Sequence, residues 1–576
     1  MKKDYFVSKM FYKMLIPSLI SSVGFALSDM ADALVVGQRM GETGLAAISL
    51  CLPIYMLMNV ITDAFGIGGG VRFSCLLGEG NEDEAVRCFN RIWKTAISTG
   101  LLFAVTVNLL APQILFILGA GEKGTQLYSS CQIYMRIISG GAPLMILNVI
   151  FLNFLRNDNN EVIAARGFII GNITDFSLNI ILVLVFDLGT AGAAASTVIG
   201  SAVAIICYLP AILGKKRNVL RISRAGLDLR QTFSCFRIGF STSVQNLFQL
   251  ILLLTVNRIM LNLGGAAHVA VFDVIYHASF FIIYLCEGTA EAAQPLISTF
   301  AGEQSEDDCR QVRRLSVVFS VVISCITAAL IIVFAKDIAL VFGISSEILP
   351  TAVYAIRIYC TGAVFMALNI ILSRYCQSRE DDRSAFVGVL LKGILVPMPC
   401  IILFSLLGDT AVWFAFPVSE AAAFALFMLY YVIAGKKRVR FDESRVYRVN
   451  LSGKNAEISA LLDGCEEFCD KWSANSSQKY CVMLVIEEIV TSIVRNALGH
   501  TPDGKIRITL IAMPDGDFTL HVLDNATEHN PLSGTGKAGN QTDFDIDKVS
   551  IILIKKKAKK YLYRQCTGFN SLTVQI

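Results

Sequence analysis

A stripe of polar side chains near the C-terminus is the feature that most directly suggests chemistry. It consists of residues spaced four apart in the segment EEIVTSIVRNALGH: Glu488, Ser492, Asn496 and His500. On an α-helix this spacing places all four on one face. A carboxylate, a hydroxyl and an amide on one face could hold Mg²⁺ and a nucleotide. The segment therefore predicts a helix that contributes to a nucleotide site.

Acidic side chains embedded in apolar sequence form a second set of candidates. A charge at the middle of a bilayer costs about 2.5–3.5 kcal/mol on insertion scales, so an acid kept there usually faces a cavity and takes part in function. A buried carboxylate can exchange a proton, and two neighbouring acids can hold Na⁺. The structural alternative is an acid at the end of a span, or one paired with Arg136, Arg357 or His277. The acids in question are Asp29, Asp32, Asp63, Asp175, Asp273, Glu287, Glu291 and Glu420.

The elements around these acids are those of a membrane protein. Hydrophobic residues make up 54% of the 576 residues and charged residues 17%, against about 25% charged in ordinary globular domains. Apolar stretches of ~20 residues, each able to cross a hydrocarbon core of about 30 Å, recur up to residue 435. We therefore expect an all-α membrane part with about twelve transmembrane helices. Their centres lie near Ser22, Met58, Phe103, Met145, Ile173, Val203, Leu250, Phe280, Val322, Ala367, Leu395 and Phe424.

The loops between these stretches predict the orientation. Loops rich in Lys and Arg usually face the cytoplasm, and here alternate connections are basic while the others are short and poor in Lys and Arg. We expect a protein of the cell membrane with both termini and the soluble C-terminal part in the cytoplasm. The net charge of +4 gives no indication of a nucleic-acid partner. The basic connections are residues 2–13, 87–94, 215–237, 310–314, 374–383 and 436–448.

An internal repeat divides the membrane part into halves. MRIISGGAPLMILNVI aligns with IRIYCTGAVFMALNII, which places Arg136 on Arg357, and an earlier match places Asp63 on Glu287. Six spans per half return the chain to the same side, so the halves are parallel repeats that face each other across a cavity. The expected boundaries are an N-lobe at 1–213, a basic cytoplasmic linker at 214–231 and a C-lobe at 232–435.

This membrane part resembles the multidrug and toxic compound extrusion (MATE) family. The strings that carry the resemblance are MADALVVGQRMGETGLAAISLCLPI, FGIGGG…LLGEGNEDEA, GTAGAAAST and, most specifically, EGTAEAAQPLISTFAGE. Members of the family are secondary antiporters. The resemblance implies export of amphipathic or cationic small molecules in exchange for H⁺ or Na⁺, by rocking of two six-helix lobes in the lipid bilayer.

Within this resemblance, Asp32 matches the first-span acid that several MATE branches use for cation coupling. Many relatives carry Asn-x-x-Leu-Asp in the fifth span, whereas this chain reads Asp175-Phe-Ser-Leu-Asn179, with the two polar residues exchanged. The acid stays on about the same helix face but ~6 Å along the axis, which leaves the choice between H⁺ and Na⁺ open. The expected ion-coupling and substrate residues are Asp32, Asp29, Asp175, Asn179, Asp63, Glu287 and Glu420.

The soluble C-terminal part, residues 440–576, has the pattern of a separate α+β domain. The turn PDGD between two alternating apolar strands is a strong hairpin signal, and helices beside a hairpin form a two-layer sandwich. The expected order is strand 446–453, helices 456–472 and 478–498, strands 505–513 and 518–524, helix 549–560 and strand 571–576.

This domain resembles the ATP-binding domains of histidine kinases and anti-sigma factors, the GHKL fold. EEIVTSIVRNA matches the first ATP box, VLDNATEHNPL the second and GFNSLTV the last strand. By this resemblance Glu488 is a general base, Asp524 binds the adenine amino group and Asn530 belongs to the second-box loop. Ser492 stands where the family has the Asn that holds Mg²⁺, and Asn496 stands where it often has His.

Two further departures weaken the expected Mg-ATP site. Ala526 replaces the glycine beside the adenine. The segment DFDIDKVSIILIKKK (543–557) has no glycine where the family has its phosphate loop, and a Cβ hinders close approach of backbone N–H groups to phosphate. We therefore expect a degenerate nucleotide site without kinase or ATPase activity, and no confident metal site. The GTGKAG run at 534–539 lacks the full spacing of a P-loop.

Two functions remain open on the sequence. One is an ion-coupled exporter whose cytoplasmic domain is regulatory or scaffolding. The other is a membrane ligand sensor that signals through the anti-sigma-like domain to a protein partner. A primary ATP-driven pump is disfavoured, because the sequence contains no Walker A lysine.

Overall fold

The computed structural model divides the chain into two compact units. Unit 1 comprises residues 1–74, 86–301 and 307–438, and unit 2 comprises residues 75–85, 302–306 and 439–576. The structure describes residues 5–118, 120, 123–214, 219–223, 229–342, 344, 346–435, 443–452, 455–498, 504–532, 546–566 and 568–576; the side chains of 25–46 and of some other helical positions lie outside this description.

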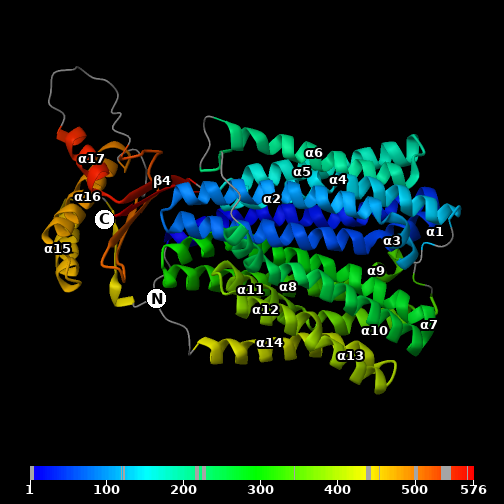
Figure 1. Cartoon of the computed structure of the whole chain (residues 1–576). Helices are drawn as coiled ribbons and strands as arrows, with labels where there is room; N and C mark the ends of the chain where they lie inside the picture. Colours follow the sequence, from blue (N-terminus) through cyan, green and yellow to red (C-terminus); the bar gives the residue numbers. More distant parts are fainter. Residues whose placement is uncertain are drawn as a thin grey trace. The chain divides into compact units, whose positions relative to one another are not determined.

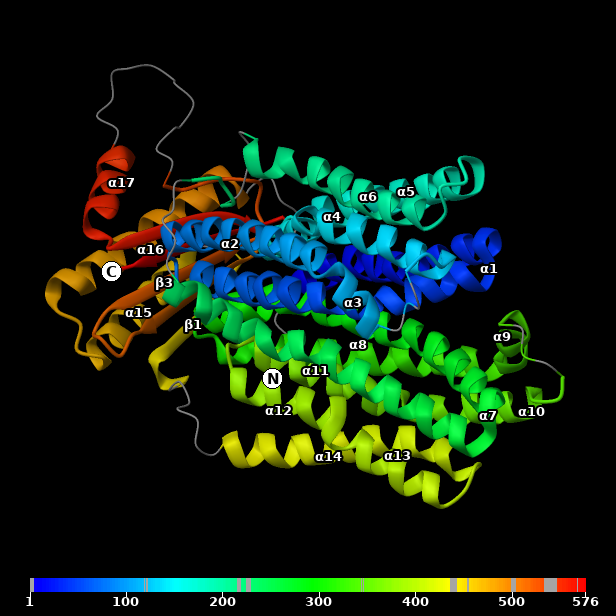
Figure 2. The ribbon, with the colours of Figure 1, turned by 45° about the vertical axis from the view of Figure 1, so that its right-hand side comes forward.

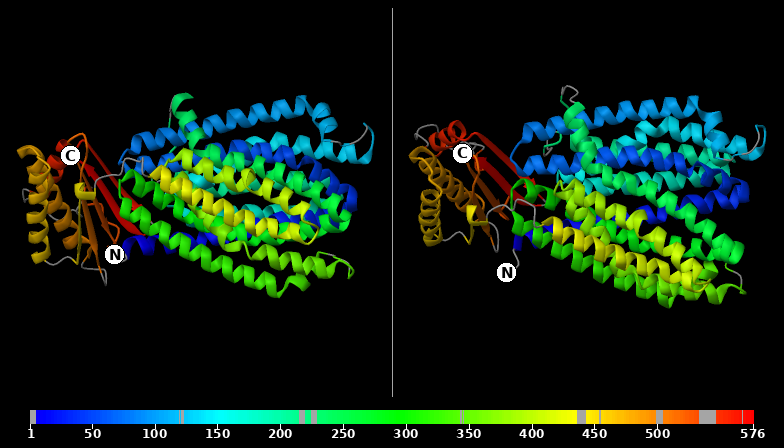
Figure 3. Two further views of the ribbon diagram at one scale, coloured as in Figure 1. Left: turned by 90° about the horizontal axis from the view of Figure 1, so that it is seen from below. Right: turned by 60° about the horizontal axis from the view of Figure 1, so that its bottom comes forward.

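The membrane part is built from helices only, within the described ranges. They run alongside one another (Figure 1, Figure 3). Short π-helical segments, η1 and η2, continue α5 and α12. The elements are α1 (Tyr5–Gly78), α2 (Glu82–Leu109), α3 (Ala111–Ile117), α4 (Gln126–Asn157), α5 (Glu161–Asn179), η1 (Ile180–Val185), α6 (Gly189–Leu213), α7 (Leu229–Gly302), α8 (Glu306–Val333), α9 (Ala335–Val341), α10 (Leu349–Cys360), α11 (Ala363–Ser378), α12 (Asp382–Leu390), η2 (Leu391–Leu395), α13 (Pro397–Leu406), η3 (Ala411–Phe414) and α14 (Ala415–Gly435).

The described residues contain ten helices long and apolar enough to cross a membrane. The bent pair α10 and α11, which meet at 43°, gives an eleventh span if counted as one. Every expected centre from Met58 to Phe424 falls inside one of these eleven. The span expected around Ser22 lies in α1, where the side chains of residues 25–46 are outside the description, so the number twelve stays a prediction.

The backbone repeats between the two halves of the membrane part. Asn159 and Glu380, which the register of Arg136 on Arg357 aligns, both have a left-handed φ, at 61° and 57°. The same register aligns the last residue of α4 with that of α11, and the first of α5 with that of α12. The long helix α7 holds two spans joined at a break, where Gly265 has φ 67° and ψ −154°.

Each half of the membrane part has an apolar core of its own. The larger cluster draws only on residues between Val256 and Ala415 and includes the buried Trp413. A smaller one joins residues between Ala47 and Met135. Figure 2 shows α4, α5 and α6 at one edge of unit 1 and α13 and α14 at the opposite edge.

The C-terminal domain is a two-layer α+β sandwich. Its five strands form one antiparallel sheet in the order β1-β2-β3-β5-β4, with α15, α16 and α17 on one face (Figure 1). A capping box starts α16, because Asn475 and Gln478 each accept from the other's backbone N–H. The elements are β1 (Val446–Leu451), α15 (Asn455–Lys471), α16 (Ser476–Asn496), β2 (Ile506–Ala512), β3 (Phe518–Asp524), α17 (Ile546–Lys557), β4 (Lys560–Cys566) and β5 (Phe569–Gln575).

The end of one expected helix is wrong, and one strand was not expected. The helix predicted at 549–560 ends at Lys557, and Lys560 begins β4, which the sequence prediction lacked. β4 pairs with β5 through a tight hairpin in which Gly568 takes φ 77°. The alternating run YLYRQC (561–566) is the signal for this strand, but it directly follows the lysine-rich segment 555–560, which is typical of an exposed helix end.

Candidate functional site

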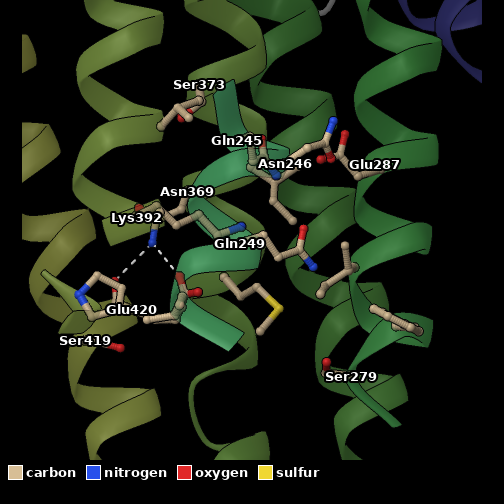
Figure 4. A pocket seen from close by; sticks show the side chains of 18 of the residues that line it. Gln245, Asn246, Gln249, Ser279, Glu287, Asn369, Ser373, Lys392, Ser419 and Glu420 are labelled. Atoms are coloured by element: carbon tan, nitrogen blue, oxygen red, sulfur yellow. Dashed lines mark hydrogen bonds between the residues drawn. The ribbon is translucent and has the colours of Figure 1, made fainter. Parts of the chain in front are cut away.

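A cavity of about 340 Å³ lies among the helices of the second half of unit 1. Its walls come from α7, α10, α11, α12, η2, α13 and α14, and α1 contributes Asp63. Small-molecule sites are typically about 300–1,000 Å³ and apolar, with a few polar groups that fix orientation. Figure 4 shows the polar groups converging from several helices. Aromatic side chains form much of the remaining wall: Phe272, Tyr276, Phe280, Tyr284, Tyr359 and Phe416.

An ion pair between α11 and α7 lies at one end of the cavity. Arg374 Nε and Nη2 donate to Glu287 Oε2 at 3.0 and 2.8 Å. Arg374 Nη1 also donates to Thr242 Oγ1 at 3.2 Å and to Gln377 Oε1 at 3.3 Å. Only 19% and 16% of the two charged side chains is exposed. The guanidinium is therefore fully engaged, and it balances the charge of Glu287.

Assigning Arg374 to a basic cytoplasmic connection was wrong. The residue lies within α11, one turn before its end, and its side chain is drawn inward by Glu287. An arginine is tolerated inside a span when an acid pairs with it. The sequence named Arg136, Arg357 and His277 as partners for the buried acids but did not consider Arg374.

The other two acids of the cavity accept hydrogen bonds from amides. Asn246 Nδ2 donates to Asp63 Oδ2 at 3.1 Å. Asn369 Nδ2 donates to Glu420 Oε2 at 2.7 Å and to the Glu420 carbonyl at 3.0 Å (Figure 4). A neutral amide donor satisfies a buried carboxyl group without adding a positive charge beside it. Both side chains therefore remain able to bind a cation or a proton. Asp63, Glu287 and Glu420, all expected from the sequence, thus lie on one cavity.

Lys392 of η2 also lines this cavity, and sequence reasoning missed it. Its side chain reaches into the hollow (Figure 4). The available signal was a single lysine in the apolar span LLKGILVPMPCIILF.

A smaller cavity of about 130 Å³ lies between the two halves of unit 1. Arg156 of α4 forms an ion pair with Glu291 of α7, with Nη1 and Oε2 2.7 Å apart, and its Nε is 3.4 Å from Glu161 Oε1. Asp63 and Arg374 line this cavity as well as the larger one. Charged groups therefore extend from the larger cavity to the boundary between the halves.

The remaining expected membrane residues lie elsewhere or outside the description. Asp175 and Asn179 are buried on α5, and the Asp175 Cβ faces Gly200 of α6. Neither lines either of the two cavities. Asp29 and Asp32 fall in α1, but their side chains are outside the described residues, as is that of Asp273.

In the C-terminal domain, the polar stripe of α16 lies beside the loop that follows β3. A small pocket of about 40 Å³ is lined by Glu488, Ser492 and Asn496 of α16. Pro531 and Leu532, which follow Asn530 in the chain, also line it. Ser492 Oγ is 2.9 Å from His529 Nε2 and also accepts from Asn496 Nδ2 at 3.4 Å. Burial lowers the pKa of His529. The side chain of Asn530 caps its own loop by accepting from the Leu532 N–H at 2.9 Å.

The expected adenine acid is already bonded within the domain. Asp524 Oδ1 accepts from Asn570 Nδ2 at 2.8 Å and from the Ala526 N–H at 3.0 Å. Burial raises the pKa of the Asp524 carboxyl to about 6, against the opposing effect of these two donors. The GTGKAG run, at 534–539, and His500 lie outside the described residues. Among the described residues, no group of three or more His, Cys, Asp or Glu side chains could hold a metal ion.

The sequence profile of the MatE family matches residues 17–181 and 240–401, more than half of the chain. The matched residues precede the C-terminal domain. The multidrug export protein MepA of Staphylococcus saprophyticus is 24% identical over 443 residues, covering 75% of this chain and 94% of that protein. MepA of Staphylococcus haemolyticus is 23% identical over 444 residues, with 75% and 95% covered.

Solved structures show the same membrane fold. An outward-facing multidrug resistance MATE family transporter of the MOP superfamily superposes with a TM-score of 0.71 at 19% identity, covering 75% of this chain and 97% of its own. A MOP superfamily transporter from Pyrococcus furiosus gives a TM-score of 0.70 at 19% identity, with the same coverage.

Proposed function

This chain belongs to the MatE family, and we propose that it exports amphipathic or cationic small molecules in exchange for H⁺ or Na⁺. As a member of this family it is a multi-pass membrane transporter and not an enzyme. Its Staphylococcus relatives are named multidrug export proteins. The family also implies coupling to a gradient of H⁺ or Na⁺.

The observation that carries this proposal is the 340 Å³ cavity. Its aromatic walls suit the apolar body of an amphipathic molecule, and an aromatic face also attracts a cation. The Glu420 side chain lines the hollow, and the group that donates to its Oε2 is the neutral amide of Asn369. We infer that Glu420 attracts the basic group of a substrate.

Coupling requires an acid that exchanges an ion as the substrate moves. Asp63 is the best placed of the described acids, since it lines both cavities and is held by Asn246 of α7 across the boundary between the halves. Uptake of H⁺ or Na⁺ by Asp63 weakens this bond. Asp32 and Asp29 in the first span, and Asp175 with Asn179 in the fifth, are the alternative coupling positions.

Transport by reconstituted protein tests the proposal. The full chain and a chain ending at Gly435 are placed in separate proteoliposomes, and efflux of a cationic dye is followed under imposed H⁺ or Na⁺ gradients. We expect gradient-driven efflux from both. Dye binding by the full chain without efflux under either gradient would instead favour a membrane sensor that signals through its cytoplasmic domain.

We propose that the C-terminal domain is regulatory and that it has a nucleotide-binding-type fold with a degenerate site. Support comes from the α+β sandwich and from the meeting of Glu488, Ser492 and Asn496 with the second-box loop. Degeneracy is supported by the 40 Å³ pocket and by Asp524, whose Oδ1 is taken by Asn570. Isothermal titration of the full chain with Mg-ATP should show weak binding or none; micromolar affinity lost in Asp524→Ala would refute degeneracy.

We further propose the domain boundaries and orientation expected from the sequence. The N-lobe is 1–213, the linker 214–231, the C-lobe 232–435 and the regulatory domain 440–576. Both termini lie in the cytoplasm, because the basic connections alternate with neutral ones. The separate apolar cores of the two halves support the division into lobes.

A further inference from the structure

The ammonium group of Lys392 stands apart from every other charge that lines the 340 Å³ cavity. Arg374 is paired with Glu287, and Asp63 and Glu420 each accept from an amide. Within the part of the chain that the structure describes, Lys392 has neither a hydrogen bond nor an ion pair. A cation that holds three N–H donors toward a hollow is a site for an acceptor.

The position of Lys392 within a membrane span carries a free-energy cost that a residue without a function would not be expected to impose. It lies near the middle of the span Asp382–Leu406, where an unpaired ammonium is costly unless a ligand or water compensates it. It also stands on the π-helical segment η2, just before Pro397 begins α13. Such π segments occur frequently at functional sites.

Comparison of the two halves shows that Lys392 is specific to the second. The register of Arg136 on Arg357 places Lys392 on Gly171. In the first half a Cβ at Gly171 would come within 2.9 Å of the Ala204 Cβ and of the Gly200 carbonyl oxygen. No side chain fits there, because α5 and α6 are in contact. In the second half the equivalent position carries a long cationic side chain, and a cavity is present.

We propose that Lys392 is a specificity-determining residue that binds an anionic group, such as a carboxylate, on the transported molecule. Charge-assisted hydrogen bonds from an ammonium to a carboxylate are among the strongest polar contacts in proteins. With Glu420 in the same cavity, the site fits an amphipathic zwitterion, its basic group toward Glu420 and its acidic group on Lys392. This assignment rests on the proposed function of export through this cavity.

The test compares two dyes that differ in one group. Rhodamine 123 is a cationic methyl ester, and the free acid produced by its hydrolysis is a zwitterion on the same ring system. Gradient-driven efflux of each is measured from proteoliposomes holding the full chain, Lys392→Met or Lys392→Arg. Equilibrium dialysis of both dyes with the purified variants gives the binding ratio independently of transport. Lys336→Met, an exposed lysine on α9, is the matched control.

We expect Lys392→Met to lower the ratio of free-acid to ester, in efflux and in binding, about tenfold, the effect of losing one charge-assisted bond. Lys392→Arg should keep the ratio within about twofold, and Lys336→Met should leave both dyes as in the wild type. If the ratio of free acid to ester is unchanged in Lys392→Met, whether or not the rates fall, the assignment of Lys392 is overturned while the proposed export function stands. Absence of efflux of both dyes from the wild type overturns the proposed function, and the assignment with it.

Discussion

The ion pair between Arg374 and Glu287 offers the sharpest test of how the cavity is held together. Replacing Arg374 by Met leaves the Glu287 carboxylate without its guanidinium and removes the donors to Thr242 and Gln377. Breaking a fully buried pair costs about 3–5 kcal/mol. Since 19% and 16% of these side chains is exposed, water in the cavity reduces this cost. We expect about 2–3 kcal/mol of destabilisation.

Removing both charges should cost much less. In the double variant Arg374→Met with Glu287→Met no charge is left unpaired, so stability should return to within about 1 kcal/mol of the wild type. The matched control is Arg310→Met, because its partner Asp307 is 46% exposed and such surface pairs contribute about 0–1 kcal/mol.

Thermal unfolding of the detergent-purified chain can be followed with a dye that fluoresces on reaction with thiols. Most of the described free cysteines are buried and react only after unfolding. We expect the order of melting temperatures to be wild type and Arg310→Met highest, the double variant slightly lower and Arg374→Met lowest. A double variant as unstable as the sum of its single variants would refute the reasoning, because it would show that the two charges do not compensate each other.

Three further outcomes follow from the site and from the topology. Asp32→Asn should abolish gradient-driven dye efflux while surface expression stays normal; unchanged efflux would move coupling to Asp63 or Asp175. The pKa of Asp524 is about 6 in the folded protein against about 3.9 in the unfolded chain, so the neutral carboxyl favours the folded state. This stabilisation is complete at low pH and is lost as the pH rises through 6. Hydrogen exchange of β3, corrected for intrinsic rates, should therefore show about 1 kcal/mol less protection at pH 7 than at pH 5, and an equal difference in Asp524→Asn would contradict this. A reporter fused after Ile576 should be active only in the cytoplasm, and an external reporter would invert the topology.

Hydropathy predicted the membrane elements well because each span must satisfy a length that the bilayer fixes. The centres from Met58 to Phe424 lie inside described spans for this reason. The hairpin between β2 and β3 was likewise predicted, since it depends on local turn chemistry. β4 was missed because a lysine-rich segment reads as an exposed helix when its pairing partner is not known.

The site was only partly predictable, because pairing between distant helices leaves no local signal. Asp63, Glu287 and Glu420 were expected as rare acids in spans, and the structure brings them to one cavity. The sequence placed Arg374 in a basic connection, because nothing local indicates its ion pair with Glu287 on a distant helix. Asp175 packs against Gly200 of α6 instead, which sequence spacing alone did not predict.

The contrast between Gly171 and Lys392 distinguishes the two halves at one aligned position. In the first half, glycine lets α5 approach α6 until backbone and Cβ atoms touch at Gly200 and Ala204. In the second half, η2 and Pro397 interrupt the equivalent helix, and a lysine occupies the aligned position. Close packing and a charged side chain exclude each other at one position. The two halves therefore use this aligned position differently: the first packs α5 against α6 there, and the second places a lysine beside a cavity.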